Sequence, residues 1–137
     1  MKVKSIIETI KQILVDGISV KFDSNGESEL SGKLYLSNGQ FYKTAINVTR
    51  VKVNLNFDLQ NITSSGNDPE ILIDKINEIL LNKFYVDEKA LYISEIGIRT
   101  IDTGLTSSIS IEYENEKTNN DSSELIGEVN FNNKQEG

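Results

Sequence analysis

The sequence predicts an α+β fold in which two helices pack on one face of a mixed or antiparallel sheet. Apolar residues recur at helical spacing over about 2–15 and 69–83, which predicts two amphipathic helices. Apolar and polar residues alternate over 51–59 and 105–113, which is typical of strands with one buried and one wet face. These segments together predict two helices covering a single sheet.

The 137 residues suffice for one hydrophobic core, which we expect to lie in a single domain over residues 1–113. A β-hairpin arm at about 24–43 and an extended acidic C-terminal segment over 114–137 complete the predicted architecture. The acidity is concentrated near the end, because residues 112–137 hold seven Asp or Glu and two Lys. We expect this segment to dock on a neighbouring subunit.

The composition excludes several classes of function. The chain has no Cys and no His, so it lacks a thiol nucleophile, a thiolate metal site and the commonest general base. Its net charge of −7 argues against nucleic-acid binding. No apolar run approaches the roughly 18 residues of a membrane helix, and the start does not resemble a signal peptide. We therefore expect no cofactor, no metal and no membrane contact, and we expect proteins as partners.

The first half of the chain is predicted to alternate short strands with turns. We expect Asp16-Gly17 to end the first helix and residues 18–22 to form a strand. Two Asn-Gly pairs, at 25–26 and 38–39, predict turns on either side of a weak strand at 30–36.

The long strand that follows changes its apolar phase. Ile46 and Val48 alternate on one parity and residues 51–59 on the other, so we expect a bulge or a bend at Thr49-Arg50. An arm that leaves a sheet and returns to it requires such a bend.

The second half carries clearer local signals. Residues 62–67 read as a polar loop, followed by Asp68 as an N-cap and Pro69 at the first helical position. A phase break near Ser94-Glu95 interrupts the next strand, and Asp102-Thr103-Gly104 predicts a tight turn before the last one.

The triplet Asp102-Thr103-Gly104 also has the composition of the catalytic turn of aspartic proteases, in which two carboxylates share a proton. Arg99 stands where that pattern prefers a small or apolar residue and Leu105 where it prefers a small one, and a hairpin turn explains the triplet fully. We therefore expect no catalytic residue, and a dimeric aspartic protease using Asp102 remains a distant alternative.

The candidate functional residues are those of a protein interface. The outward face of the last strand is small and neutral and lacks the Lys and Glu that usually protect an exposed sheet. Polar loops and the end of the acidic segment offer further contact points. The predicted interface residues are Asn38, Gly39, Ser64, Ser65, Asn67, Asp102, Thr103, Thr106, Ser108, Ser110, Leu125, Val129 and Phe131.

The element order resembles the tail terminator family (tail completion, minor tail protein U-like) of long-tailed bacteriophages and phage tail-like particles. The residues that carry the resemblance are the run VKVNLNF at 51–57, Asp68-Pro69-Glu70 with the helix at 69–83, IGIRTIDTG at 96–104 and LTSSISIEY at 105–113. The resemblance covers about residues 1–15 and 44–115; the arm and the extension depart from the family pattern.

The resemblance implies a non-enzymatic structural protein that forms a hexameric ring. Such a ring caps the tail tube and offers a surface to the head-side connector or neck protein. The implied partners are further copies of the chain, the tail tube protein, the connector and, in a contractile tail, the sheath protein. The implied location is the virion tail or neck, assembled in the bacterial host cytoplasm.

Other functions stay open at this point. A neck or connector protein, or a baseplate adaptor, differs from a terminator in copy number and in position along the tail. The protease requires a dimer with peptidase activity that Asp102→Asn abolishes. A small cytoplasmic binding domain would be a monomer that takes part in no particle.

Overall fold

A computed structural model describes residues 2–23, 26 and 28–116 of the chain. The chain divides into two compact units. The first consists of Met1–Gly39 and Lys52–Glu112, and the second of Gln40–Val51 and Tyr113–Gly137. Three strands run from one unit into the other.

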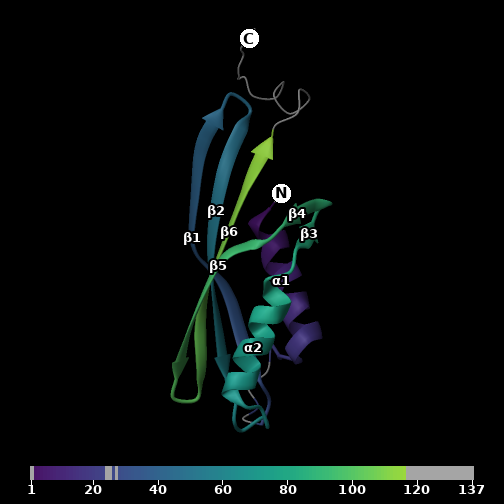
Figure 1. Ribbon diagram of the computed structural model, residues 1–137, viewed down its shortest axis with the longest axis vertical. Coiled ribbons are helices and arrows are strands. Elements are labelled where there is room, and N and C mark those ends of the chain that lie inside the picture. The colour runs from purple at the N-terminus through teal and green to yellow at the C-terminus, as the bar shows by residue number, and fades with distance from the viewer. Residues whose placement is uncertain (1, 24–25, 27, 117–137) are drawn as a thin grey trace. The chain divides into compact units, whose positions relative to one another are not determined.

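Four long strands form one antiparallel sheet in the order β1-β2-β6-β5, and two short strands, β3 and β4, pair separately (Figure 1). The first and last strands of that order, β1 and β5, are the edges of the sheet. The strands are β1 (Ser31–Ala45), β2 (Val48–Gln60), β3 (Phe84–Val86), β4 (Lys89–Leu91), β5 (Ile93–Ile101) and β6 (Gly104–Glu116).

Within the first unit, two helices cover one face of the sheet (Figure 1). Helix α1 (Val3–Ile18) and helix α2 (Pro69–Leu80) contact each other, and each buries three aliphatic residues one helical turn apart. The strands meet them with alternate residues. The buried side chains are Ile6, Ile10 and Leu14 of α1, Leu72, Ile76 and Leu80 of α2, Val53, Leu55, Phe57 and Leu59 of β2, and Leu105, Ile109 and Ile111 of β6. The predicted α+β fold, with both helices on one face, is confirmed.

Helix α1 continues through the residue predicted to end it. Gly17 lies inside the helix, which ends at Ile18, and Ser19 adopts the left-handed conformation with φ 57°. A Cβ at position 17 would lie 2.5 Å from Cδ1 of Ile79, so glycine is explained here by the close approach of α2. The predicted strand over 18–22 is also wrong, since this segment makes only an isolated bridge between Lys21 and Ser31.

The predicted turn at Asn38-Gly39 is wrong, because β1 runs without a break from Ser31 to Ala45. The hairpin turns at Ile46 and Asn47 instead, and Ile46 is 85% exposed. Ile46 therefore belongs to a turn and not to the apolar face of the long strand. Of the other predicted turn, residues 24 and 25 lie outside the described part of the chain.

Helix α2 begins as predicted. The Asp68 side chain accepts hydrogen bonds from the backbone N–H groups of Glu70 and Ile71, at 2.9 and 3.3 Å, and Pro69 takes the first helical position. The helix ends at Leu80 and not at 83. The short β3–β4 hairpin that follows was not predicted.

The closing hairpin agrees with the sequence prediction at both points. The β5–β6 register shifts between Ile93 and Glu95, which is the irregularity expected near Ser94-Glu95. Ile101 then pairs with Gly104, which leaves Asp102 and Thr103 as a two-residue turn. Residues 105–113 alternate between buried and more exposed positions as expected.

Candidate protein interface

Among the described residues, no group of three or more Asp or Glu could hold a metal ion, and no helix is long and apolar enough to cross a membrane. Asp102, the carboxylate of the protease alternative, is exposed in the β5–β6 turn. Burial raises the pKa of the Tyr113 phenol above 10.0. Three surfaces of the described residues are open to a protein partner.

The first surface is the sheet face opposite the helices, where β6 carries three of the predicted interface residues. Thr106 donates a 2.6 Å hydrogen bond to Oδ1 of Asp58, whose Oδ2 accepts a 3.1 Å bond from the Tyr35 hydroxyl. Ser110 likewise donates to Oδ1 of Asn54, at 2.7 Å. These side chains form a polar layer across β1, β2 and β6, in which the hydroxyl groups of Tyr35, Thr106 and Ser110 each donate a hydrogen bond.

Ser108 is the exposed member of the β6 row and lines a shallow hollow of about 410 Å³. Asn56 and Arg99 line the same hollow, and Gly97 leaves it open because it has no side chain. The structure thus brings Thr106, Ser108 and Ser110 to one polar face. Their role in an interface stays a prediction.

The second surface joins the loop before α2 to the β5–β6 turn. The carbonyl oxygen of Thr103 accepts hydrogen bonds from the N–H groups of Asn61 and Ile62, at 3.1 and 3.3 Å. Ser65 donates to the carbonyl of Ile62, and Asn67 donates to Ser65. Two predicted contact loops are therefore held together as one end surface, to which Ser64 and Asp102 add exposed polar groups.

Of the remaining predicted interface residues, the structure describes Asn38 and Gly39. Asn38 and Gly39 are exposed within strand β1 and do not form a turn. Leu125, Val129 and Phe131 lie outside the described residues.

The third surface, in the second unit, corresponds only in part to the arm predicted at about 24–43, because the hairpin extends to Ala45 and turns at Ile46 and Asn47. It is the hairpin formed by residues 40–51, in which Phe41, Tyr42 and Ile46 are 64%, 44% and 85% exposed. Every residue from 40 to 47 is exposed, so no described residue covers either face of this part of the hairpin.

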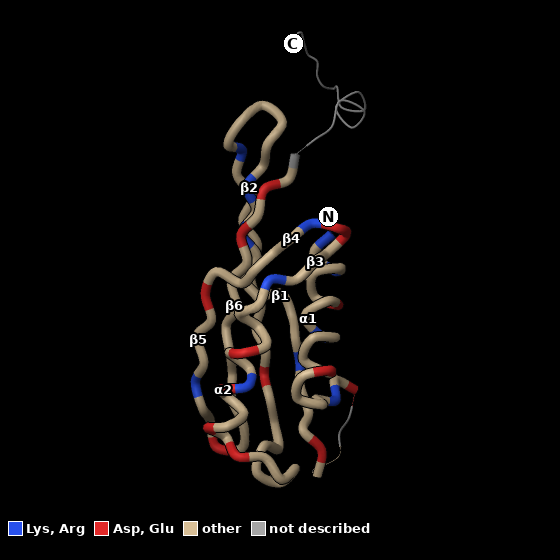
Figure 2. The backbone as a smooth tube through the Cα atoms, turned by 45° about the vertical axis from the view of Figure 1, so that its right-hand side comes forward, with Lys and Arg blue, Asp and Glu red and all other residues tan. Residues whose placement is uncertain are grey.

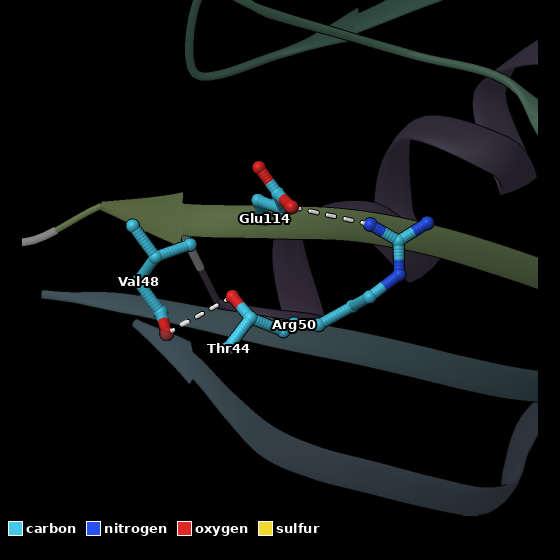
Figure 3. A network of polar contacts seen from close by, with 4 residues as sticks. All are labelled: Thr44, Val48, Arg50 and Glu114. Atoms are coloured by element: carbon cyan, nitrogen blue, oxygen red, sulfur yellow. Dashed lines mark hydrogen bonds and ion pairs between the residues drawn. The ribbon is translucent and has the colours of Figure 1, made fainter. Parts of the chain in front are cut away.

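The hairpin makes one polar contact with the end of β6 and one beside its own turn. Arg50 makes a 3.2 Å ion pair with Glu114 at the end of β6, and the Thr44 hydroxyl donates to the carbonyl of Val48 across the hairpin (Figure 3). Lys43 and Arg50 are its only charged residues, and it carries no carboxylate (Figure 2). It is thus a cationic, aromatic element in an acidic chain.

One sequence signal could have revealed this surface. Phe41 and Tyr42 are adjacent, so a strand must point one of them away from any core that the other contacts. The prediction missed it because the Asn38-Gly39 turn placed these residues at a strand start.

A comparison with protein-family models found no match to this chain, and a search of curated proteins found none. The functional interpretation therefore depends on the surfaces described above and on the resemblance in the sequence.

Proposed function

We propose that the protein is a non-enzymatic structural protein that assembles with copies of itself into a ring, and that it acts as a tail terminator of a phage or tail-like particle. The proposed ring is a hexamer. It caps the tail tube and presents its other face to the head-side connector. The observation that carries the assembly part of this proposal is the uncovered hairpin at 40–51.

The exposed apolar side chains of Phe41, Tyr42 and Ile46 are costly for a protein that stays a monomer. A single exposed apolar side chain is ordinary, but three on one short hairpin expose apolar surface on both of its faces, which is typical of a segment that contacts another protein. Aromatic residues are also enriched where proteins bind one another. A partner that covers Phe41, Tyr42 and Ile46 would remove this area from water and stabilise the complex.

The end surface around Thr103 and the loop at 61–67 supports the second part of the proposal. It is polar, internally hydrogen-bonded and rigidly connected to the sheet through Asn61 and Ile62. Such a surface can meet the flat end of another ring without losing its own hydrogen bonds. We assign the axial contact to this surface.

The test is to add the purified protein to growing tail tubes assembled from the tube protein encoded in the same genome. A terminator binds one end of each tube and stops elongation, so the tubes become shorter as its concentration rises. Tubes of unchanged length with no density at either end would contradict the proposal. A connector or adaptor would instead bind without stopping growth.

A further inference from the structure

We propose that the 40–51 hairpin of one copy seats in a groove beside α1 of a second copy, so that neighbouring subunits join head to tail. This inference deepens the proposed function and depends on it, because it names the receiving surface for the hairpin. Four observations support it: the apolar lining of the groove, the carboxylates of Glu8 and Asp23 on its rim, its size, and the length of strand that separates it along the chain from the hairpin.

The groove lies in the first unit, between α1 and the segment at 19–23. Its volume is about 730 Å³. Val15, Val20 and Phe22 line it, with Val20 buried against Gly32 and the Phe22 ring tilted by 46° to that of Phe57 at a centroid distance of 6.2 Å. An open hollow of this size, partly apolar, accommodates an aromatic side chain such as Phe41 or Tyr42, which point to opposite faces of the hairpin.

The rim of the groove offers charges to the hairpin. Three carboxylates (Glu8, Asp23 and Glu29) and two ammonium groups (Lys11 and Lys21) line it, and Lys11 is already placed over the Phe22 ring at 5.4 Å. Neither Glu8 nor Asp23 has an ion-pair partner among the described residues. Lys43 on the hairpin is likewise unpaired within the described chain, so it can supply the cation that these carboxylates lack.

The hairpin cannot fill the groove of its own chain. The apolar surface of the groove lies beside Gly32, and strand β1 runs from there to Gly39. Seven strand residues span about 23 Å, whereas Tyr42 is three residues beyond Gly39 and reaches only about 10 Å from it in any direction. A hairpin that fills the groove must therefore come from another molecule, and a second copy carries such a hairpin with the cation Lys43.

A contact of this kind is heterologous, because two different surfaces of the chain meet. Repetition of such a contact closes into a ring when the rotation permits and otherwise extends as a filament. The proposed hairpin-to-groove contact thus provides the geometry that the ring requires, without using the end surface that faces the tube.

The absence of cysteine permits a direct test. Thr44→Cys on the hairpin and Lys21→Cys at the groove are prepared as separate proteins, mixed and treated with a short bis-maleimide. We expect a covalent dimer from this mixture and its loss from a mixture of Thr44→Cys with Asp74→Cys, an exposed control position on α2.

A charge exchange provides the second arm. Lys43→Glu should weaken self-association by about tenfold or more, and Glu8→Lys in the other copy should restore it. An oligomer that forms without the Thr44–Lys21 cross-link would overturn the groove assignment and leave the proposed function standing. A protein that remains monomeric even with tail tubes would overturn the proposed function, and this inference with it.

Discussion

Replacement of Gly104 by Ala should strongly destabilise the protein, although it adds only one methyl group. Gly104 is the residue at which β6 begins, directly after the Asp102-Thr103 turn. An ideal Cβ at this position would overlap the carbonyl oxygen of Leu59 and lie 2.8 Å from its carbonyl carbon. Both atoms belong to the backbone of β2, so no side-chain rotation can relieve the overlap.

The cost follows from the separation that the two strands must undergo. Overpacking by one methylene costs about 1–3 kcal/mol where neighbours can shift, and we expect Gly104→Ala to reach or exceed the upper value. For a chain of this size, 3 kcal/mol lowers the Tm by about 10 °C. The same separation should lengthen the bonds from Asn61 and Ile62 to the Thr103 carbonyl, which hold the end surface together.

Gly97→Ala in β5 is the matched control. Its Cβ would meet only the Ser108 hydroxyl oxygen, at 3.3 Å, and this side chain can rotate away. The loss of backbone freedom in the unfolded chain favours Ala by about 0.4–1 kcal/mol, so the net change should be small. Thermal and urea unfolding of the two variants measure the difference. Equal Tm values for Gly104→Ala and Gly97→Ala would refute the reasoning.

Three further predictions concern single side chains. Asp68→Ala should lower the free energy of unfolding by about 1 kcal/mol, because the N–H groups of Glu70 and Ile71 lose their N-cap acceptor. Urea unfolding measures the loss against Asp74→Ala, an exposed control position on α2. Equal free energies of unfolding for the two variants would contradict the prediction. Ser107→Ala should raise that free energy by about 1 kcal/mol, because the buried Ser107 hydroxyl has no hydrogen-bond partner in the described part of the chain. A lower Tm of the variant in differential scanning calorimetry would contradict this. Burial raises the pKa of Tyr113 above 10.0, so the folded protein holds the phenolic proton more strongly than the unfolded chain does. The resulting contribution to the free energy of unfolding is fully present below pH 10 and is lost as the pH rises further. As the pH rises above 10, the free energy of unfolding of Tyr113→Phe should therefore fall less than that of the natural protein. Equal losses in urea unfolding over this pH range would count against the prediction.

The parts of the fold that could be predicted are those with a local cause. The Asp68 cap, the Ser94-Glu95 irregularity and the Asp102-Thr103 turn each depend on residues within a few positions of one another. The end of α1 depends instead on a distant contact, because Gly17 stays helical where it packs against Ile79 of α2. Sequence spacing alone carries no information on that contact.

The β3–β4 hairpin was missed for a different reason. Its turn places Asp87 and Glu88 at φ 51° and 66°, a left-handed geometry for which Gly and Asn are the usual residues. The sequence there carries neither, so no turn signal was present. At Asn38-Gly39 the reverse holds: a strong turn signal lies within a continuous strand, because pairing along β1 and β2 extends past it.

The candidate interface was predictable only in part. Polar residues in loops and on the β6 face could be identified because no core needs them. The exposed hairpin was missed, since Phe41, Tyr42 and Ile46 are of the types that normally fill a core, and the adjacency of Phe41 and Tyr42 was the one signal against that reading. Their exposure became evident only when the turn was placed at Ile46.

The most direct test of the central claim, that the chain assembles through its hairpin, is the native mass in solution combined with negative-stain imaging. For a 15.3 kDa chain the account predicts a closed ring of about 90 kDa with a central hole, as expected of six copies joined head to tail. Phe41→Ser with Ile46→Ser should reduce it to monomers, and Ile71→Ser, which removes an exposed apolar side chain from α2, should not. A ring that persists in the hairpin variant would contradict the claim.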